Sequence, residues 1–377
     1  MMISFYIAIG LLLAYGILFQ FYHSWWKDLP DFTAGTAAAP VKISVIVPAR
    51  DEEENIAACL HSICRQNYPA HLFQLIVIDD HSSDHTFQIA SSIVYEGIQI
   101  ICTTLPPTAN NMAPKKRAIN AGISMASGTL IVTTDADCTV GPDWLQNIAA
   151  YYLQSKQVFI AAPVKIKEGA TLLSKFQALD FLTMQGITAG AVYKRFHNMC
   201  NGANLAYEKK VFHEVDGFNG IDSIASGDDM LLMGKIAKLY PQQLGFIKSA
   251  AAIVTTLPAT DWKSFFRQRI RWASKATHYQ QPAIFFALLL VYLTNLFIFC
   301  FLVMGLWQKF ALILFVLLCI AKFFMELFFV KDVAVFFQQS SLLPWLFILQ
   351  PLHIVYIVVS GLLGQFKSYE WKGRKLK

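Results

Sequence analysis

Residues 129–137 read TLIVTTDAD, an apolar β-branched run followed directly by two aspartates one residue apart. The run Leu130–Thr133 has the composition of a buried strand, and the aspartates come where that strand ends. Carboxylates at a strand end project into a shared space, where Asp135 and Asp137 can hold a hard divalent cation through oxygen ligands. Such pairs also arise as solvated turns, so the interpretation depends on the surrounding sequence.

Short apolar runs and helical segments alternate on both sides of this stretch. The other expected strands are Ile43–Val47, Leu75–Ile78 and Ile98–Ile101, and the expected helices are 52–65, 84–95, 115–126 and 142–153. This alternation predicts an α/β fold with a mainly parallel sheet covered on both faces. Ligands of such sheets bind outside the carboxyl ends of the strands. Polar clusters fall at those ends: residues 48–52, residues 79–80 and residues 135–137.

Both ends of the chain are apolar. The 377 residues are 55% hydrophobic and 15% charged, less charge than a soluble protein of this length needs. Residues 3–22 carry no charge and are long enough to span a bilayer. The N-terminal residues 1–3 lack the positive charge of a signal peptide, and Trp25-Trp26-Lys27 is typical of an interfacial anchor. We therefore expect a transmembrane helix over 1–24 and a linker over 25–41.

The C-terminal part predicts further membrane segments. Residues 261–281 are basic and aromatic, as in a helix that lies in the membrane interface. Region 282–365 predicts two or three spans, and its middle segment holds Lys322 and Glu326 on one helical face. A basic tail, 366–377, follows. Three C-terminal spans would separate that tail from the central domain, 42–260, against the positive-inside rule. Either one segment is re-entrant or interfacial, or the tail departs from the rule.

Composition also excludes some classes of protein. The net charge of +6 is modest, and no Lys/Arg-rich run with interleaved aromatic residues occurs, so we expect no nucleic-acid partner. The seven cysteines form no C-x-x-C pair, which argues against a zinc site or a disulfide framework.

The remaining polar clusters each have a functional and a structural interpretation. Asp80 can accept hydrogen bonds from a nucleobase or ribose, whereas Asp84 is explained as a helix cap. The backbone of Pro48 and Ala49 can line a nucleotide pocket. The cations that begin with Lys115 either meet a diphosphate or form an exposed helix start.

Two later clusters carry the same ambiguity. Asp228 and Asp229 open a helix, so one of them can cap it while the other acts as a general base near an acceptor hydroxyl. Gln268 and Trp272 share a helical face with Arg271 beside them. They form an interfacial helix with a Trp anchor, or an Arg that stabilises a leaving diphosphate and a Trp that shapes an acceptor site.

In this order, the segments resemble glycosyltransferase family 2, in the membrane-bound branch that includes cellulose, chitin and hyaluronan synthases and ceramide glucosyltransferases. The similarity covers roughly residues 43–275 and the flanking spans. It implies an inverting enzyme with a GT-A-type nucleotide-sugar-binding domain. It further implies that Pro48, Ala49 and Glu52 line the nucleotide pocket and that Asp80 contacts the base. Asp135 and Asp137 resemble the family's nucleotide and metal carboxylates.

The later motifs extend the resemblance. Lys115 and Asn120 match the Lys and Asn of K-x-G-x-L-N, and residues 201–204 resemble the acceptor-side N-G-A/S-N loop, with Asn201 and Gly202. Asp229 matches the catalytic base, and Gln268, Arg271 and Trp272 match Q-x-x-R-W. Three positions depart from the family pattern: Arg117 replaces a small residue, Asp228 stands where Glu is usual, and Leu231 where a further Asp is often found.

The resemblance implies transfer from a nucleotide-sugar, with a UDP-sugar expected, to a lipid or a growing glycan, assisted by Mg²⁺ or Mn²⁺. We expect an integral protein of a bacterial inner or cell membrane, with its catalytic domain in the cytoplasm. A transporter built from the spans alone is disfavoured by their small number, although Lys322 and Glu326 keep it open. Two further alternatives also stay open. One is a processive polysaccharide synthase, which the lack of long additions and extra spans disfavours. The other is a non-catalytic membrane subunit that binds nucleotide-sugars, which the intact set of Asp135, Asp137, Asp229 and Arg271 disfavours.

Overall fold

The chain divides into two compact units. The computed structural model describes residues 2–35, 40–106, 112–224, 227–273, 281–364, 369–371 and 374–376. The helical unit comprises Met1–Leu29, Ile166–His197 and Pro258–Glu370. The sheet unit comprises Pro30–Lys165, Asn198–Leu257 and Trp371–Lys377.

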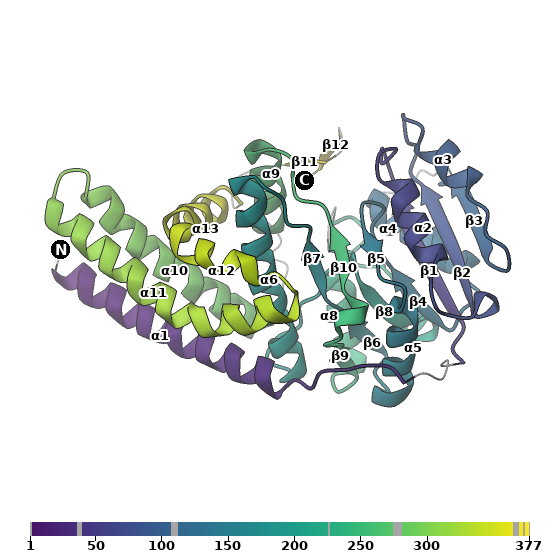
Figure 1. Cartoon of the computed structure of the whole chain (residues 1–377), viewed down its shortest axis with the longest axis horizontal. Helices are drawn as coiled ribbons and strands as arrows, with labels where there is room; N and C mark the ends of the chain where they lie inside the picture. Colours follow the sequence, from purple (N-terminus) through teal and green to yellow (C-terminus); the bar gives the residue numbers. More distant parts are fainter. Residues whose placement is uncertain are drawn as a thin grey trace. The chain divides into compact units, whose positions relative to one another are not determined.

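The sheet unit is built around a seven-stranded sheet of order β3-β2-β1-β4-β8-β6-β9 (Figure 1). Its strands are β1 (Ile43–Ala49), β2 (Phe73–Asp79), β3 (Gln99–Thr104), β4 (Leu130–Thr133), β6 (Phe159–Ala161), β8 (Leu205–Glu208) and β9 (Leu244–Phe246). The first four are parallel, with Ile43 opposite both Phe73 and Leu130, whereas β8 runs antiparallel to β4 and β6. The expected α/β fold with a mainly parallel sheet is confirmed.

The alternation of strands and helices follows the predicted one. The helices of this unit are α2 (Ile56–Cys64), α3 (Thr86–Ser92), α4 (Pro114–Met125), α5 (Trp144–Ser155), α7 (Lys209–Glu214) and α8 (Met230–Leu239), with short 3-10 turns at η1 (Ala70–Leu72) and η2 (Ala250–Ala252). β2 is buried at every position, because both faces of the sheet are covered. A smaller sheet has the order β5-β10-β7, from β5 (Thr139–Val140), β10 (Val254–Thr256) and β7 (Val164–Ile166).

Gly128 marks a close approach between the backbones of two central strands. It precedes β4, and its N–H donates to Ser44 Oγ at 2.9 Å. A Cβ there would lie 2.6 Å from the Ile43 carbonyl carbon and the Ser44 nitrogen. Because backbone atoms cannot move aside, we expect Gly128→Ala to destabilise the fold by about 2–3 kcal/mol.

Thermal unfolding of the full chain in detergent measures this effect. Gly234→Ala in α8 is the matched control, since no atom lies within 4 Å of a Cβ at that position. The control is expected to keep or raise the melting temperature, because Ala favours a helix by up to about 1 kcal/mol. An unchanged melting temperature in Gly128→Ala would contradict the close approach.

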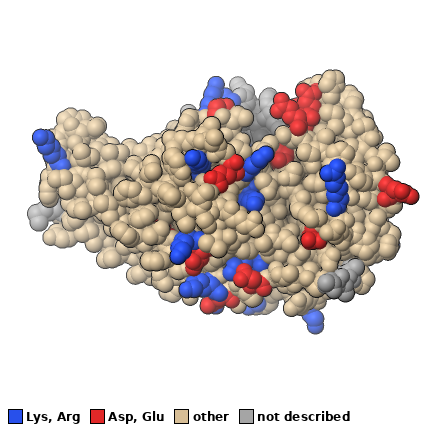
Figure 2. Space-filling model, viewed as in Figure 1, with Lys and Arg blue, Asp and Glu red and all other residues tan. Residues whose placement is uncertain are grey.

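The helical unit contains long apolar helices. They are α1 (Met2–Asp28), α6 (Leu172–Tyr193), α9 (Trp262–Ala273), α10 (Pro282–Met304), α11 (Lys309–Phe336), α12 (Leu343–Ile348) and α13 (Gln350–Gly364), with the turn η4 (Ser340–Leu342). α1 packs against α6, α10 and α11. Within the described ranges, Ile3–Asp28, Pro282–Met304 and Lys309–Phe336 are long and apolar enough to cross a membrane. Figure 2 shows almost no charge on the surface over these long helices.

The last apolar segment is not one straight helix. Ser340–Ile348 and Gln350–Gly364 meet at a bend of 75°, as in a broken span or a re-entrant loop. The expected number of C-terminal spans is two or three, and it depends on whether this bent segment crosses the membrane or re-enters on the same side. Beyond it, the structure forms the short strands β11 (Tyr369–Trp371) and β12 (Arg374–Leu376). The tail residues Lys367, Lys372 and Lys377 lie outside the described residues, as do residues 36–39 of the linker and 274–280 of the interfacial segment.

The two units do not follow the linear division of the chain. α6, expected within the central domain 42–260, belongs to the helical unit. Most of its positions are buried and it packs against α1 and α11. A helix that is apolar around its circumference is buried on several sides, and its sequence does not show which neighbours bury it.

Lys322 and Glu326, the two charges expected at membrane depth, are paired. Lys322 Nζ lies 2.6 Å from Glu326 Oε1 and 3.0 Å from Gln350 Oε1. Glu326 also accepts hydrogen bonds from Tyr15 and Gln350. The cost of burying both charges is thus offset by a mutual ion pair and further hydrogen bonds.

Candidate functional site

The candidate site lies at one edge of the main sheet, where β1, β2 and β4 end and β8 begins. The strand exits are joined by backbone hydrogen bonds: Asp80 N–H donates to the Ala49 carbonyl at 2.9 Å, and Thr134 N–H donates to the Ile46 carbonyl at 3.3 Å. The carbonyl of Ala49 therefore joins the end of β1 to the loop after β2. The parallel register brings the polar clusters at 48–52, 79–80 and 135–137 to this one edge, as the sequence predicts.

Lys115 stands at the centre of the site, between two carboxylates. Its Nζ lies 2.7 Å from Asp135 Oδ1 and 3.2 Å from Asp228 Oδ2. Burial opposes its charge, but the two aspartates outweigh this effect and raise the pKa of Lys115 above its ordinary value. The ammonium stays protonated, and it is three-quarters covered. The interpretation of this residue as an exposed helix start is therefore wrong.

The two cations after Lys115 have separate partners. Lys116 is buried and donates to the carbonyls of Ile221 and Ile224, so it anchors the start of α4 to that segment. Arg117 Nη2 lies 3.5 Å from Asp80 Oδ1. Asn120, in the middle of α4, lines a separate pocket of about 340 Å³ with Met112, residues 212–213, residues 216–219 and Asp222.

Gly202 brings the expected acceptor-side loop against Lys115. A Cβ on Gly202 would lie 3.2 Å from Lys115 Nζ, 3.2 Å from Asp228 Oδ2 and 3.7 Å from Asp229 Cβ. A Cβ at these distances is tight, so the side-chain ends of Lys115 and Asp228 would have to shift by a few tenths of an ångström. Asn204 fixes the end of this loop, because its side chain is buried and hydrogen-bonded to Trp144 and to two backbone carbonyls. The structure thus places residues 115, 135, 202, 228 and 229 together.

Asp229 is the residue that caps α8. Its Oδ1 accepts the Met230 N–H at 2.7 Å, and its Oδ2 accepts the Gly202 N–H at 3.1 Å. Asp228 instead forms the ion pair with Lys115. The sequence left open which aspartate caps the helix, and it expected the other to be the base. Here the cap and the expected base are the same residue, and each carboxylate oxygen keeps a second lone pair for another proton donor.

Asp137 is buried near the acidic side chains of Asp135 and Glu52, and the charge of Lys115 offsets them only in part. Burial, Asp135 and Glu52 together raise the pKa of Asp137 from 3.8 to about 6. Its other contacts are Thr256 Oγ1 at 3.4 Å and Cys138 Sγ at 3.4 Å, which carry no positive charge. No group of three or more His, Cys, Asp or Glu residues suited to a metal occurs within the described ranges. Asp135 and Asp137 nevertheless fit Mg²⁺ or Mn²⁺, because such cations often take one or two carboxylates and complete their shell with phosphate oxygens and water.

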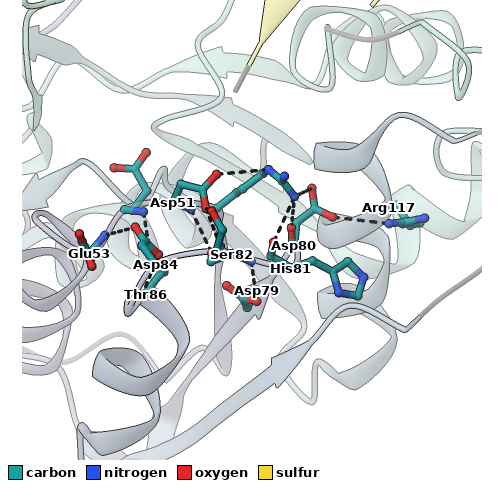
Figure 3. A network of polar contacts seen from close by, with 12 residues as sticks. Asp51, Glu53, Asp79, Asp80, His81, Ser82, Asp84, Thr86 and Arg117 are labelled. Carbon is teal, nitrogen blue, oxygen red and sulfur yellow. Dashed lines mark hydrogen bonds and ion pairs between the residues drawn. The ribbon is translucent and has the colours of Figure 1, made fainter. Parts of the chain in front are cut away.

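Asp80 lies buried between two arginines (Figure 3). Arg50 Nη1 is 3.8 Å from its Oδ2 and also donates to its backbone carbonyl, while Arg117 approaches Oδ1. Sequence reasoning expected the Asp80 carboxylate at the nucleobase but missed both arginines. Arg50 follows β1 directly, so its place at the strand exit is a signal for it. For Arg117 the sequence predicted a contact with a diphosphate or an exposed helix start, and no pair with Asp80.

The loop beside Asp80 is locked by acidic side chains (Figure 3). Asp51 has a left-handed φ of 47° and accepts the Ser83 N–H at 2.8 Å. Asp84 accepts N–H groups from Thr86 and Glu53, at 3.0 and 3.1 Å. Asp84 therefore joins the starts of α2 and α3, and the formal cap of α3 is the next residue, His85. These hydrogen bonds tie the loop after β1 to the loop after β2 at the edge of the site.

The Q-x-x-R-W residues belong to the other unit. Gln268, Arg271 and Trp272 all lie on α9 of the helical unit. The Trp272 ring is 4.3 Å from the Arg269 guanidinium carbon and 6.2 Å from the Phe181 ring. Arg269, which sequence reasoning passed over, is buried and pairs with Asp180.

Comparison with known proteins identifies the family. The model of glycosyl transferase family 21 matches residues 8–377. The probable glycosyltransferase YdaM of Bacillus subtilis is 28% identical over 265 residues, which cover 68% of this chain and 60% of YdaM. A beta-monoglucosyldiacylglycerol synthase of Trichormus variabilis is 28% identical over 116 residues, 30% of this chain and 24% of that protein. The chain therefore spans less than two thirds of the length of each of these relatives.

A solved structure supports the fold. The mannosyltransferase PcManGT from Pyrobaculum calidifontis, in complex with GDP-Man and Mn²⁺, aligns with a TM-score of 0.57 at 18% identity, over 95% of this chain and 99% of that chain. The resemblance to membrane-bound family 2 enzymes is confirmed at the level of the GT-A-like fold and glycosyltransferase class. The chain has a GT-A-like fold and belongs to glycosyl transferase family 21.

Proposed function

We propose that this chain is an inverting, metal-dependent enzyme that transfers a sugar from a nucleotide-sugar to a lipid or glycan acceptor at a membrane. The observation that carries the proposal is the meeting of Lys115, Asp135 and Asp228 at Gly202, beside Asp229. This arrangement places a cation and a candidate base within one small space at the exits of the strands.

The donor side of the proposed reaction uses the sheet unit. Asp135 and Asp137 would hold Mg²⁺ or Mn²⁺, which supplies positive charge to the diphosphate when bound. In the proposed reaction, the ammonium of Lys115 gives up part of its ion pair with Asp135 and contacts the leaving phosphate instead. Pro48, Ala49 and Glu52 line the nucleotide pocket, and Asp80 contacts the base from between its two arginines. A UDP-sugar is the expected donor; PcManGT, whose solved complex contains GDP-Man and Mn²⁺, is a fold neighbour that takes another nucleotide.

The acceptor side completes a single displacement. Asp229 takes the proton from an acceptor hydroxyl, which attacks the anomeric carbon opposite the nucleoside diphosphate and inverts its configuration. Asn201 and Gly202 form the acceptor-side loop, with Trp272 shaping the acceptor site. Gln268 contacts the donor, and Arg271 stabilises charge on the leaving group. The long apolar helices and the relative named for a lipid product support a lipid acceptor, and we place the sheet unit on the cytoplasmic side.

The proposal is tested by nucleoside diphosphate release from the purified full chain in detergent. A panel of UDP-sugars and GDP-sugars is supplied with Mg²⁺, Mn²⁺ or EDTA, with and without a lipid extract. We expect one donor to release nucleoside diphosphate, and this release should require metal and increase with lipid. By NMR, the product should have the anomeric configuration opposite to that of the donor. Absence of release with every donor contradicts the proposal, and a ladder of polymer masses identifies a processive synthase instead.

The pKa of Asp137 predicts how metal binding and stability depend on pH. Because the folded state raises this pKa from 3.8 to about 6, the protonated carboxyl is favoured, and its stabilising contribution is lost as pH rises through about 6. The metal-free protein should therefore melt at a lower temperature at pH 7 than at pH 5, and added Mn²⁺ should raise the melting temperature more at pH 7.

Melting curves at both pH values, with and without Mn²⁺, measure this effect. Asp137→Asn removes the titrating group. The melting temperature of this variant should depend less on pH, and added Mn²⁺ should raise it much less than in the wild type. A Mn²⁺ shift of equal size at both pH values would show that no proton competes with the cation at Asp137.

A further inference from the structure

Arg269 is a buried cation next to the Q-x-x-R-W residues on α9. Arg269 is 2% exposed, and its Nη2 lies 2.9 Å from Asp180 Oδ2 on α6. Its Nε and Nη1 atoms have no hydrogen-bond partner among the described residues. Such a pair is expensive to bury and contributes little net stability compared with apolar side chains of the same size. Stability alone therefore does not explain it.

Aromatic rings surround the Arg269 guanidinium. Its central carbon lies 4.3 Å from the centre of the Trp272 ring, 5.1 Å from that of Phe265 and 6.0 Å from that of Tyr356. A guanidinium at such distances attracts the faces of aromatic rings. Trp272, the proposed acceptor-side residue, is thus held directly by Arg269.

Asp180 links this arrangement to the membrane helices. Its Oδ1 lies 3.6 Å from His353 Nε2 on α13. One helical turn earlier, Gln350 bonds both Lys322 and Glu326 of α11. Burial opposes ionisation of Asp180, but Arg269 and His353 outweigh it and hold the pKa of this carboxyl below its ordinary value. A charged Asp180 therefore connects α9 with α6, α13 and α11.

We propose that Asp180 is a positioning residue for sugar transfer, which fixes Arg269 and thereby holds α9, with Gln268, Arg271 and Trp272, in one orientation. The inference rests on the proposed function, because it assigns Asp180 a role through residues to which that function gives direct contacts. Asp180 itself touches neither donor nor acceptor in this scheme.

The experiment compares variants that alter the pair with and without leaving an unpaired charge. Asp180→Asn strands the Arg269 charge, so it can lower the yield of folded protein. The double variant Asp180→Asn/Arg269→Met removes both charges and should fold. Arg269→Lys keeps the charge but loses the planar group that stacks on Trp272.

The readouts are kcat and the KM for donor and acceptor, per molecule of folded enzyme counted by nucleotide binding. We expect each variant to lose at least about tenfold in kcat, since small misplacements of catalytic groups have effects of this size. The donor KM should change by a smaller factor than kcat, because most of the proposed donor contacts lie in the sheet unit and only Gln268 lies on α9. Full kcat in the double variant and in Arg269→Lys would reduce the pair to a structural role and overturn the inference.

Two controls separate this inference from the proposed function. Asp332→Asn removes the 2.7 Å contact between His23 and Asp332, which joins α1 and α11 away from α9, and should leave kcat unchanged. Arg271→Ala should abolish transfer. An active wild type whose transfer depends on Arg271 but not on Asp180 refutes the positioning role alone. A wild type without transfer, or with transfer that is indifferent to Arg271, refutes the proposed function instead.

Discussion

Asp229→Asn is expected to reduce sugar transfer by at least about a thousandfold, because a general base contributes about 10²- to 10⁴-fold and the amide cannot take the acceptor proton. Nucleotide-sugar binding should persist, since the expected donor contacts lie elsewhere. Asn caps helices well, so its oxygen can still accept the Met230 N–H. Its NH₂ group would then face the Gly202 N–H, which costs some stability but leaves the fold intact. Turnover assays and donor titration on the same preparation measure both effects.

Asp228→Asn is the matched control for this experiment. Asp228 is adjacent in sequence, but its carboxylate is paired with Lys115 and does not cap α8. Its loss should weaken donor binding or slow turnover by a smaller factor, because Lys115 keeps its partner Asp135. Retained turnover in Asp229→Asn would refute the assignment of the base, and an equal loss in Asp228→Asn would show that the effect follows from damage to the loop.

Lys322→Met is expected to destabilise the protein by about 3–5 kcal/mol, because it leaves the Glu326 carboxylate buried without its cation. The folded fraction in detergent and the melting temperature should both fall. Lys322→Met/Glu326→Gln removes both charges, keeps an acceptor for Tyr15 and should recover most of the loss. An unchanged melting temperature in the single variant would mean that Glu326 is neutral or wetted in the native state.

Much of the sheet unit could be predicted from the sequence. Parallel strands that are covered on both faces have continuous apolar runs, and the runs at 43–47, 75–78, 98–101 and 130–133 correspond to β1 to β4. The edge strand β3 is only partly buried. The polar clusters at their ends lie together because ligands of parallel sheets collect at strand exits. The long apolar helices follow from composition alone.

The parts that could not be predicted depend on contacts between distant segments. The pattern of β8 does not show that it runs antiparallel to β4, because both directions need the same buried residues. Asp228 and Asp229 are chemically identical, and only the position of Gly202 decides which one receives its N–H. The pairs Arg117–Asp80 and Arg269–Asp180 join residues 37 and 89 positions apart, and no local spacing encodes them.

The reversed direction of β8 affects which length changes the family can accept. At the site edge, β1, β2 and β4 leave the sheet, whereas β8 enters it through the loop at Gly202. A parallel strand must be followed by a crossover, so residues added after it shift a helix as well as the site. A segment that leads into an antiparallel strand carries no such constraint. We therefore expect insertions and deletions before Asn201 to alter the proposed acceptor-side loop while the carboxylates of the proposed donor side stay in place.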